Sequence, residues 1–367
     1  MKVTKANVYS ISVPKKSVFA VAYAVRKAAE SIIVCLHTDT GLIGVGEAVP
    51  VKEVTGESKK EVYLQLKDFC QAIEGFDFQN HEEILEEAKI VFANMPSALC
   101  AIDTAIWDIK GQLLKKPLYK IWGGAKDFCQ ASFSLGILPI EETLEETEEL
   151  VTKGISHLKY KIGLNIHEDI RRIKKVRENY PNIKIYLDAN QGYTVKEALE
   201  VVRELATYQI ELMEQPVAKE DLEGLIKVAQ NSSFPIVADE AIQDPPSLDR
   251  LLQIGTVPII NIKLMKCGGP SNALSMMQTA KNAGISVMIG CMIETRVGIT
   301  TGLHVAQSQD IVQYIDLDGC WDLSEDIVSQ GGAILESGKE YVSDGSGLGV
   351  CLDKELLLSH VDEGRSS

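Results

Sequence analysis

The sequence contains no uninterrupted apolar run of about 18 residues or more, which is the length that a membrane-spanning helix needs. We therefore expect no membrane partner. The first residues, MKVTKANVYS, lack the apolar core of a secretory signal peptide. The eight cysteines occur singly and form no CxxC pair, which is typical of reduced thiols rather than of a disulfide framework or a zinc site. These absences together predict a cytoplasmic protein.

An excess of positive charge is also lacking. The chain carries 37 Lys and Arg against 52 Asp and Glu, a net charge of −15. A phosphate backbone repels such a chain, so we expect no nucleic acid partner. The charge does not restrict small-molecule substrates, because the local charges at a binding site decide those. The length of 367 residues suffices for two domains with a large core, and we expect a homo-oligomer.

Charged side chains recur about every 25 residues through the middle of the chain, each at the end of an apolar run. These residues are Lys159, Lys161, Asp188, Glu214, Asp239 and Lys263. The runs are rich in Ile, Val and Leu and predict buried strands, while the segments between them predict helices. A βα unit that repeats at this interval is typical of a parallel barrel.

The predicted barrel has an α/β fold of the (β/α)7β, TIM-like kind. Its strands are expected at 131–135, 156–162, 183–188, 210–214, 235–239, 258–263, 285–290 and 312–316. Its helices are expected at 141–153, 166–179, 194–207, 218–231, 245–254, 270–283 and 298–309. The chain from about residue 330 is rich in glycine and predicts irregular structure.

The first 125 residues do not follow the barrel period. Strands at 3–13, 31–37 and 42–46, followed by helices at 57–76, 81–92 and 97–115, predict a separate α+β domain. We thus expect three units: an α+β domain at 1–125, a catalytic barrel at 126–325, and a C-terminal segment at 326–367 that packs back on the first domain.

Charges at the carboxyl ends of barrel strands converge on one mouth, where barrel active sites lie. Asp188, Glu214 and Asp239 come from three successive strands. Carboxylates without Cys or His suit Mg²⁺, with Mn²⁺ as the alternative ion. Each carboxylate could instead cap the helix that follows it. The common register of all three favours the metal site.

Lysines flank the predicted metal site. Lys159 and Lys161 are two residues apart on one strand, so both face the same way, which is inward if they are to reach the metal. Lys263 faces the cavity from the opposite side, and Lys266 is expected in the following loop. Two bases on opposite faces of a metal-held substrate can invert a stereocentre, because one removes a proton and the other returns it.

The stretches YLDANQG, EQPV, ADE and NIKLMKCGG resemble the muconate lactonizing branch of the enolase superfamily, and are closely similar to dipeptide epimerases of the L-Ala-D/L-Glu epimerase type. The resemblance implies a (β/α)7β barrel with an N-terminal α+β capping domain. It implies that Asp188, Glu214 and Asp239 bind Mg²⁺. It also implies that Lys161 and Lys263 are the acid/base catalysts, and that Lys159 gives electrostatic support.

The predicted eighth strand ends in Asp316 and Asp318, which share a face and could bind a cation or cap a turn. The resemblance implies that this pair binds the free ammonium group of a dipeptide. N-acylamino acid racemases, o-succinylbenzoate synthases and muconate-type cycloisomerases resemble the chain in ligands and lysines and remain alternatives, although their substrates lack that ammonium group. The seventh strand carries no His, so we set aside the sugar-acid dehydratases of the mandelate racemase branch.

Four further residues are candidate substrate contacts. Ser134 occupies a position where the resemblance implies a hydroxyl that touches substrate. Glu294, after the seventh strand, is a candidate contact, a supporting residue or a helix start. A hairpin at 16–28 is expected over the mouth, where the resemblance implies an arginine in glutamate-specific members. Ala24 stands at that position and Arg26 lies two residues further on, which favours a neutral or hydrophobic second residue.

The sequence thus predicts a Mg²⁺-dependent dipeptide epimerase that inverts the α-carbon of the C-terminal residue by 1,1-proton transfer through an enediolate. Two alternative functions belong to other classes of protein. A binding protein on a decayed barrel is disfavoured because all six charged groups are present. A Schiff-base aldolase would use one lysine and no metal, so metal dependence would exclude it.

Overall fold

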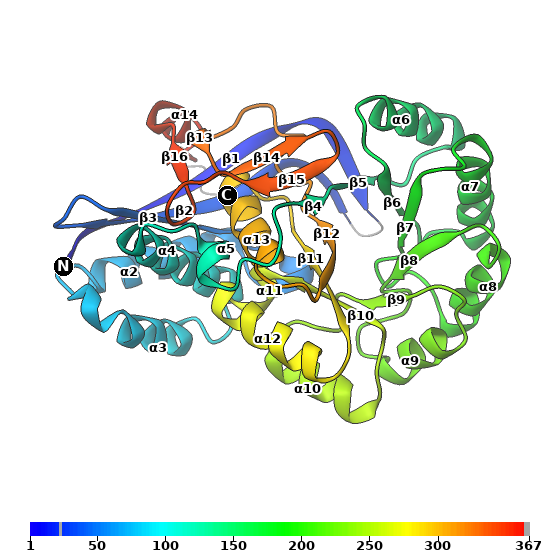
Figure 1. Cartoon of the computed structure of the whole chain (residues 1–367), viewed down its shortest axis with the longest axis horizontal. Coiled ribbons are helices and arrows are strands. Elements are labelled where there is room, and N and C mark those ends of the chain that lie inside the picture. Colours follow the sequence, from blue (N-terminus) through cyan, green and yellow to red (C-terminus); the bar gives the residue numbers. More distant parts are fainter. Residues whose placement is uncertain (22–23, 363–367) are drawn as a thin grey trace.

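The computed structural model describes residues 1–21 and 24–362, and the side chains of residues 18–25 lie outside that description. It combines an N-terminal unit of one antiparallel sheet and several helices with a parallel barrel (Figure 1). No helix in the described part of the chain is long and apolar enough to cross a membrane.

The N-terminal sheet has the antiparallel order β1-β2-β3. Its strands are β1 (Val3–Val21), β2 (Ala24–Thr38) and β3 (Ile43–Ala48). The helices of this unit are α1 (Lys52–Thr55), α2 (Lys59–Ala72), α3 (His81–Val91), α4 (Pro96–Leu114) and α5 (Leu118–Ile121). Of these, only the short helices α1 and α5 were not predicted. Alternating apolar residues of β1 and β2 pack with α2, α3 and α4 in one core.

Two glycines in β3 allow α4 to lie directly on the sheet. A Cβ at Gly44 would lie 2.1 Å from the carbonyl oxygen of Ala105, and one at Gly46 would lie 1.9 Å from that of Ala101. No side chain fits in that space, so the sheet and α4 meet through backbone contact. This close packing fixes the position of β3, whose end leads into the segment beside the barrel mouth.

The barrel is the predicted (β/α)7β fold. Its parallel strands follow chain order: β5 (Ser132–Leu135), β6 (His157–Lys161), β7 (Lys184–Asp188), β8 (Ile210–Glu214), β9 (Ile236–Ala238), β10 (Ile259–Lys263), β11 (Ser286–Gly290) and β12 (Val312–Asp316). The helices that alternate with them are α6 (Ile140–Thr152), α7 (Ile166–Asn179), α8 (Val195–Leu205), α9 (Leu222–Gln230), α10 (Pro245–Ile254), α12 (Pro270–Asn282) and α13 (Arg296–Ser308). Figure 1 shows α6 to α9 on the outside of β6 to β9.

The first and last strands of the barrel sheet, β5 and β12, are joined by a hydrogen bond from a side chain to the backbone. Ser132 Oγ on β5 donates a hydrogen bond of 2.6 Å to the carbonyl oxygen of Ile315 on β12. Inside the barrel, side chains alternate along each strand, so an apolar layer lies beneath the side chains at the strand ends. That buried layer is formed by Tyr186, Leu212, Val237, Ile259 and Met288. It seals the barrel beneath the charged side chains at the mouth.

The C-terminal segment is more regular than the sequence predicts. It forms β13 (Val328–Gly331), β14 (Ala333–Glu336), β15 (Lys339–Val342), β16 (Val350–Leu352) and α14 (Lys354–Ser359). Glycines that indicated irregular chain lie in the short connections between these strands; Gly332 and Gly338, for example, have φ of 75° and 73°. The segment then contacts β1, where Ser12 N donates to the His360 carbonyl at 3.1 Å and Asp362 N to the Ser10 carbonyl at 3.0 Å.

Candidate active site

A cavity of about 500 Å³ lies at the carboxyl ends of the barrel strands. Barrel residues in its wall include Ser134, Lys161, Asn190, Lys263, Asp316 and Asp318. The N-terminal unit contributes residues from β1, β2 and the start of α1, among them Lys15, Arg26 and Val51. The cavity is therefore enclosed by both units, and the strand-end charges predicted to meet in one place lie in or directly beneath its wall.

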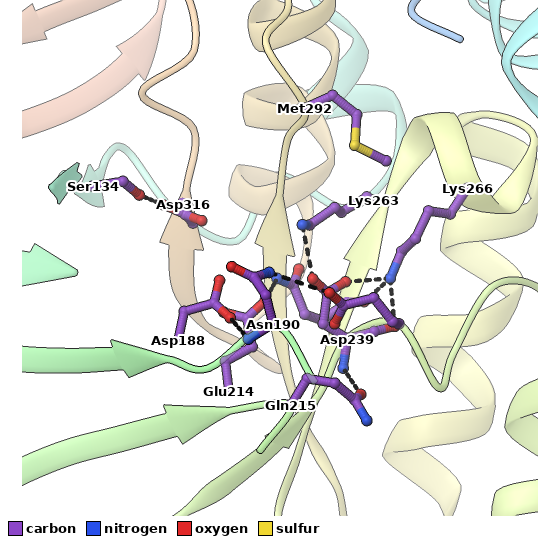
Figure 2. A network of polar contacts seen from close by, with 12 residues as sticks. Ser134, Asp188, Asn190, Glu214, Gln215, Asp239, Lys263, Lys266, Met292 and Asp316 are labelled. Carbon is purple, nitrogen blue, oxygen red and sulfur yellow. Dashed lines mark hydrogen bonds and ion pairs between the residues drawn. The ribbon is translucent and has the colours of Figure 1, made fainter. Parts of the chain in front are cut away.

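Three carboxylates gather beneath the lysines of this cavity. Asp188 and Glu214 end β7 and β8 and are neighbours in register, and Asp239 directly follows β9. All three are buried, with at most 1% of their surface exposed. Figure 2 shows them side by side. Burial and the nearby Asp188 raise the pKa of Glu214 to about 8, because another buried negative charge beside Asp188 is unfavourable.

Lys159 lies at the centre of this charge cluster and is fully buried. Its Nζ is 2.9 Å from Asp188 Oδ2, 2.7 Å from Glu214 Oε2 and 2.7 Å from Asp316 Oδ2. Burial alone would lower the pKa of the Lys159 amine, but these carboxylates raise it well above its usual value. Lys159 is thus a permanent cation in the barrel interior.

Lys161 and Lys263 line the cavity from opposite sides. They end β6 and β10, and three strands separate β6 from β10 in the eight-stranded barrel. Lys161 Nζ lies 2.6 Å from Asp188 Oδ2, and Lys263 Nζ lies 2.8 Å from Asp239 Oδ2. Burial opposes the charge on Lys263, whereas Asp239 and Glu214 raise the pKa of its amine well above the usual value. A small molecule in the cavity would have one amine on each side.

Lys266 is placed differently from the prediction. It lies in a short helix, α11 (Leu264–Cys267), and is buried rather than looped out. Its amine donates to the carbonyl oxygen of Asp239 at 2.6 Å and also contacts the Asp239 carboxylate. The helical turn after β10 points the side chain inward, and Asp239 is therefore held by Lys263 and Lys266 together (Figure 2).

Several uncharged residues that position the carboxylates were missed by the sequence analysis. Asn261 Nδ2 donates to Glu214 Oε1 at 2.8 Å, and Gln215 Oε1 accepts from the backbone N–H of Asp239 at 3.0 Å. Asn190 Nδ2 donates to Glu240 Oε1 at 3.1 Å. A signal was present for Asn261, which lies two residues before Lys263 on β10 and so shares its face. Asn190 lies beyond the end of β7 with φ of 41°, where strand alternation does not apply.

The three carboxylates match a metal site in their chemistry but not in their present arrangement. Among the residues described, no three Asp, Glu, His or Cys side chains are arranged to hold a metal ion as they stand. Ammonium groups lie against the oxygens that an ion would use, on Asp188 and on Asp239. The donor set is nevertheless one that Mg²⁺ favours, because it is made of buried carboxylate oxygens from three neighbouring strands.

Asp316, Asp318 and Ser134 form a second acidic group at the cavity wall. Ser134 Oγ donates to Asp316 Oδ1 at 3.1 Å, and its backbone N–H donates to Asp318 Oδ2 at 2.7 Å. Lys159 and Lys161 lower the pKa of Asp316 against the effect of burial. Burial and the charge of Asp316 raise the pKa of Asp318 to about 6. Within the described chain Asp318 forms no ion pair, so a cation in the cavity would lower its energy.

Glu294 lies behind the cavity wall. Its neighbours Met292 and Ile293 line the cavity, while Glu294 is buried and accepts a hydrogen bond of 3.1 Å from the backbone N–H of Met292. Burial and the nearby Glu47 of β3 raise the pKa of Glu294 to about 8. This geometry gives Glu294 a supporting position beneath the wall.

The β1–β2 hairpin runs from the N-terminal unit to the cavity (Figure 1). Its register pairs Phe19 with Arg26 and Val21 with Ala24. The prediction that the Ala24 side chain faces substrate lies outside the described residues. Arg26 lines the cavity, and its Nη2 lies 2.8 Å from Glu53 Oε2 on α1. On the other strand Lys15 Nζ lies 3.0 Å from Asp322 Oδ2.

Two family models match consecutive parts of the chain. Residues 4–123 match the N-terminal domain of the mandelate racemase / muconate lactonizing enzyme family, and residues 142–356 match the enolase C-terminal domain-like family. Together they span the N-terminal unit and almost all of the barrel and C-terminal segment.

Known proteins of this family are similar over nearly the whole chain. A hydrophobic dipeptide epimerase of Enterococcus faecalis is 38% identical, over 95% of this chain and 99% of its own length. An N-succinyl-L-Arg/Lys racemase of Bacillus cereus is 32% identical over 97% of each chain. The crystal structure of a dipeptide epimerase of Enterococcus faecalis, complexed with Mg and L-Leu-L-Tyr, is 39% identical with a TM-score of 0.92, over 95% of this chain and 99% of that one. The chain therefore belongs to the mandelate racemase / muconate lactonizing enzyme family of the enolase superfamily, and it is an isomerase of the epimerase and racemase type.

Proposed function

We propose that this chain is a Mg²⁺-dependent dipeptide epimerase that inverts the α-carbon of the C-terminal residue. The observation that carries the proposal is the opposition of Lys161 and Lys263 across one cavity, with three carboxylates beneath them. Similarity to the dipeptide epimerase of Enterococcus faecalis supports it. The test is a library of L,L-dipeptides in deuterated water, in which a substrate gains mass at its α-carbon. The absence of any exchange would contradict it.

Asp188, Glu214 and Asp239 would hold Mg²⁺, and Mn²⁺ is proposed as its substitute. The bound ion supplies positive charge that offsets the negative charge of an enediolate, without which a proton beside a carboxylate is not acidic enough to remove. Lys159, fully buried and paired with carboxylates, adds a fixed positive charge on the same side.

The proton transfers belong to Lys161 and Lys263. One amine takes the α-proton from one face of the substrate, and the ammonium on the other face returns a proton to the same carbon. The electron pair of the C–H bond is held in the enediolate between the two steps, and the configuration is inverted. Because the two amines end β6 and β10, neither reaches the face that the other serves.

Asp316 and Asp318 are proposed to bind the free ammonium group of the dipeptide. Asp318 supports this assignment, because it lines the cavity and lacks an ion pair within the described chain. N-acetylation of the substrate removes the cation. A hydrogen bond to a charged group contributes about 1.5–3 kcal/mol, so kcat/KM should fall by roughly 10- to 100-fold. The measurement compares free and N-acetylated forms of one dipeptide.

An Asp318→Asn variant serves as the matched control for this prediction. It should lower kcat/KM for the free dipeptide and leave the N-acetylated form little affected, because only the free form carries the charge. Equal kcat/KM for both forms in the wild type would instead favour an N-acylamino acid racemase. The N-succinyl-L-Arg/Lys racemase of Bacillus cereus is the relative that makes this second candidate specific.

The second residue of the substrate is proposed to be neutral or hydrophobic. Val51 of the N-terminal unit, and Met292 and Ile293 after β11, supply apolar parts of the cavity wall. Arg26, which could attract an acidic side chain, is paired with Glu53. L-Ala-L-Phe or L-Ala-L-Leu should therefore have a higher kcat/KM than L-Ala-L-Glu. A tenfold or greater preference for L-Ala-L-Glu over every neutral dipeptide would contradict this.

We propose that each of the three units has a separate role. Residues 1–125 cover the mouth, residues 126–325 carry the reaction, and residues 326–367 return to the first unit. The hydrogen bonds that join His360 and Asp362 to β1 support the last part of this division. The hairpin residues in the cavity wall support the first.

A further inference from the structure

An arginine and a glutamate of the N-terminal unit form an ion pair at the rim of the cavity. Arg26 on β2 lines the cavity, and its Nη2 lies 2.8 Å from Glu53 Oε2 on α1. The two side chains are 34% and 44% exposed. A hydrogen bond from its own backbone N–H and the Arg26 guanidinium lower the pKa of Glu53, which favours its charged form. The positive charge of Arg26 is therefore already offset within the protein.

The other cations of the outer cavity are engaged as well. Lys15 pairs with Asp322 at 3.0 Å, and Lys153 pairs with Glu149 at 2.5 Å. Lys16 Nζ donates to the carbonyl oxygen of Trp321 at 3.4 Å. Arg26 differs from these lysines in its planar, forked donor group, which matches the geometry of a carboxylate. It is thus the rim cation best suited to an acidic ligand, and Glu53 occupies it.

In the proposed orientation of the substrate the pair lies toward its C-terminal end, because α1 contacts α11, which follows β10. Figure 2 shows Ser134 and Asp316 on the Asp188 side of the buried carboxylates, and Lys263 with Met292 above Asp239. Arg26 belongs to the wall that the N-terminal unit forms with Val51, just before α1. With the ammonium group at Asp316 and Asp318, the C-terminal side chain of a bound dipeptide would extend toward this wall.

We propose that Glu53 is a specificity-determining residue that excludes acidic side chains from the second position of the dipeptide. Its carboxylate takes the place at Arg26 that the substrate carboxylate would need. An aspartate or glutamate side chain that entered would have to displace Glu53, or lie beside it as a second negative charge for one guanidinium. A neutral side chain does not need to displace Glu53 and is not repelled by its charge. The inference rests on the proposed function and names the residue that restricts its substrates.

The test is the selectivity of a Glu53→Gln variant. Glutamine keeps the size of the side chain but frees the charge of Arg26. Exposed ion pairs are weak, but here the loss of a competitor for Arg26 and the loss of a repulsion act in the same direction. The ratio of kcat/KM for L-Ala-L-Glu to kcat/KM for L-Ala-L-Phe should rise roughly three- to tenfold. In Glu53→Gln/Arg26→Gln the ratio should return to the wild-type value.

A matched control is Glu30→Gln. Glu30 is also a glutamate of the N-terminal unit in an ion pair, with Lys59 Nζ at 2.5 Å, but its partner Lys59 does not line the cavity as Arg26 does. This change should leave the substrate ratio as it is in the wild type. An unchanged ratio in Glu53→Gln, or a rise that persists after Arg26→Gln, overturns the inference while the proposed function stands. Failure of the wild type to exchange the α-proton of any dipeptide overturns the proposed function, and the inference with it.

Discussion

Alanine in place of Lys161 or Lys263 should abolish epimerisation. General acid–base catalysis contributes roughly 10²- to 10⁴-fold, and inversion needs both amines, so the loss in kcat should be at least of that order for either variant. In the proposed mechanism each amine serves one face of the substrate, because Lys161 and Lys263 end strands on opposite sides of the barrel. One enantiomer should therefore still exchange its α-proton with deuterated water in a single variant, and mass spectrometry of separated stereoisomers would detect it.

A Lys161→Ala/Lys263→Ala double variant should exchange the α-proton of neither enantiomer. A suitable control is Lys175→Ala, because Lys175 forms an exposed ion pair with Glu178 on α7 and does not line the cavity. Wild-type rates of epimerisation in both single lysine variants would show that the two-base assignment is wrong. Exchange of both enantiomers in a single variant would point to one base that reaches both faces.

Removal of the divalent cation should have an effect of similar size. Excess EDTA should abolish turnover and added Mg²⁺ should restore it, with Mn²⁺ tested as a substitute. Asp239→Asn should have the same consequence, because it removes a full negative charge from a carboxylate that lies against two lysines. Calorimetric titration with Mg²⁺ gives a readout that does not depend on turnover, and it should show weakened binding in the variant.

Asp244→Asn provides the comparison for Asp239→Asn. Asp244 is the next aspartate along the chain, and its carboxylate caps α10 by accepting from Ser247 N at 2.9 Å. That variant should lose a little stability and retain Mg²⁺ binding. Full activity of the wild type in excess EDTA would rule the metal mechanism out, whatever the variants show.

The barrel could be predicted because its signals are local. Strands such as Ile259–Lys263 are short apolar runs, each with a charged residue at its end, and the helices between them keep one spacing. The C-terminal strands were missed because they are three or four residues long and lie between glycines. In such segments turn signals outweigh the short apolar pattern, and only pairing with a partner strand selects the extended form.

The candidate site likewise contains residues that local sequence patterns predict and contacts that they do not. Period-two alternation places Lys159 and Lys161 on one face, which is inward if they are to reach the metal, and chain order places Asp188, Glu214 and Asp239 on neighbouring strand ends. No local pattern shows that Lys266 turns inward on α11 to reach Asp239. That contact depends on the path of the chain after β10, which is set by packing.

The amino-acid sequence alone therefore determined the barrel, its N-terminal α+β unit and the residue types at the mouth, because these follow from periodicity and strand order. Only the tertiary structure decided which charges neutralise one another. Arg26 and Glu53 are 27 residues apart, on different elements, and they form an ion pair because β2 and the start of α1 meet at the rim of the cavity. Ion pairing falls off within a few ångströms, and distances of that kind depend on how whole elements pack.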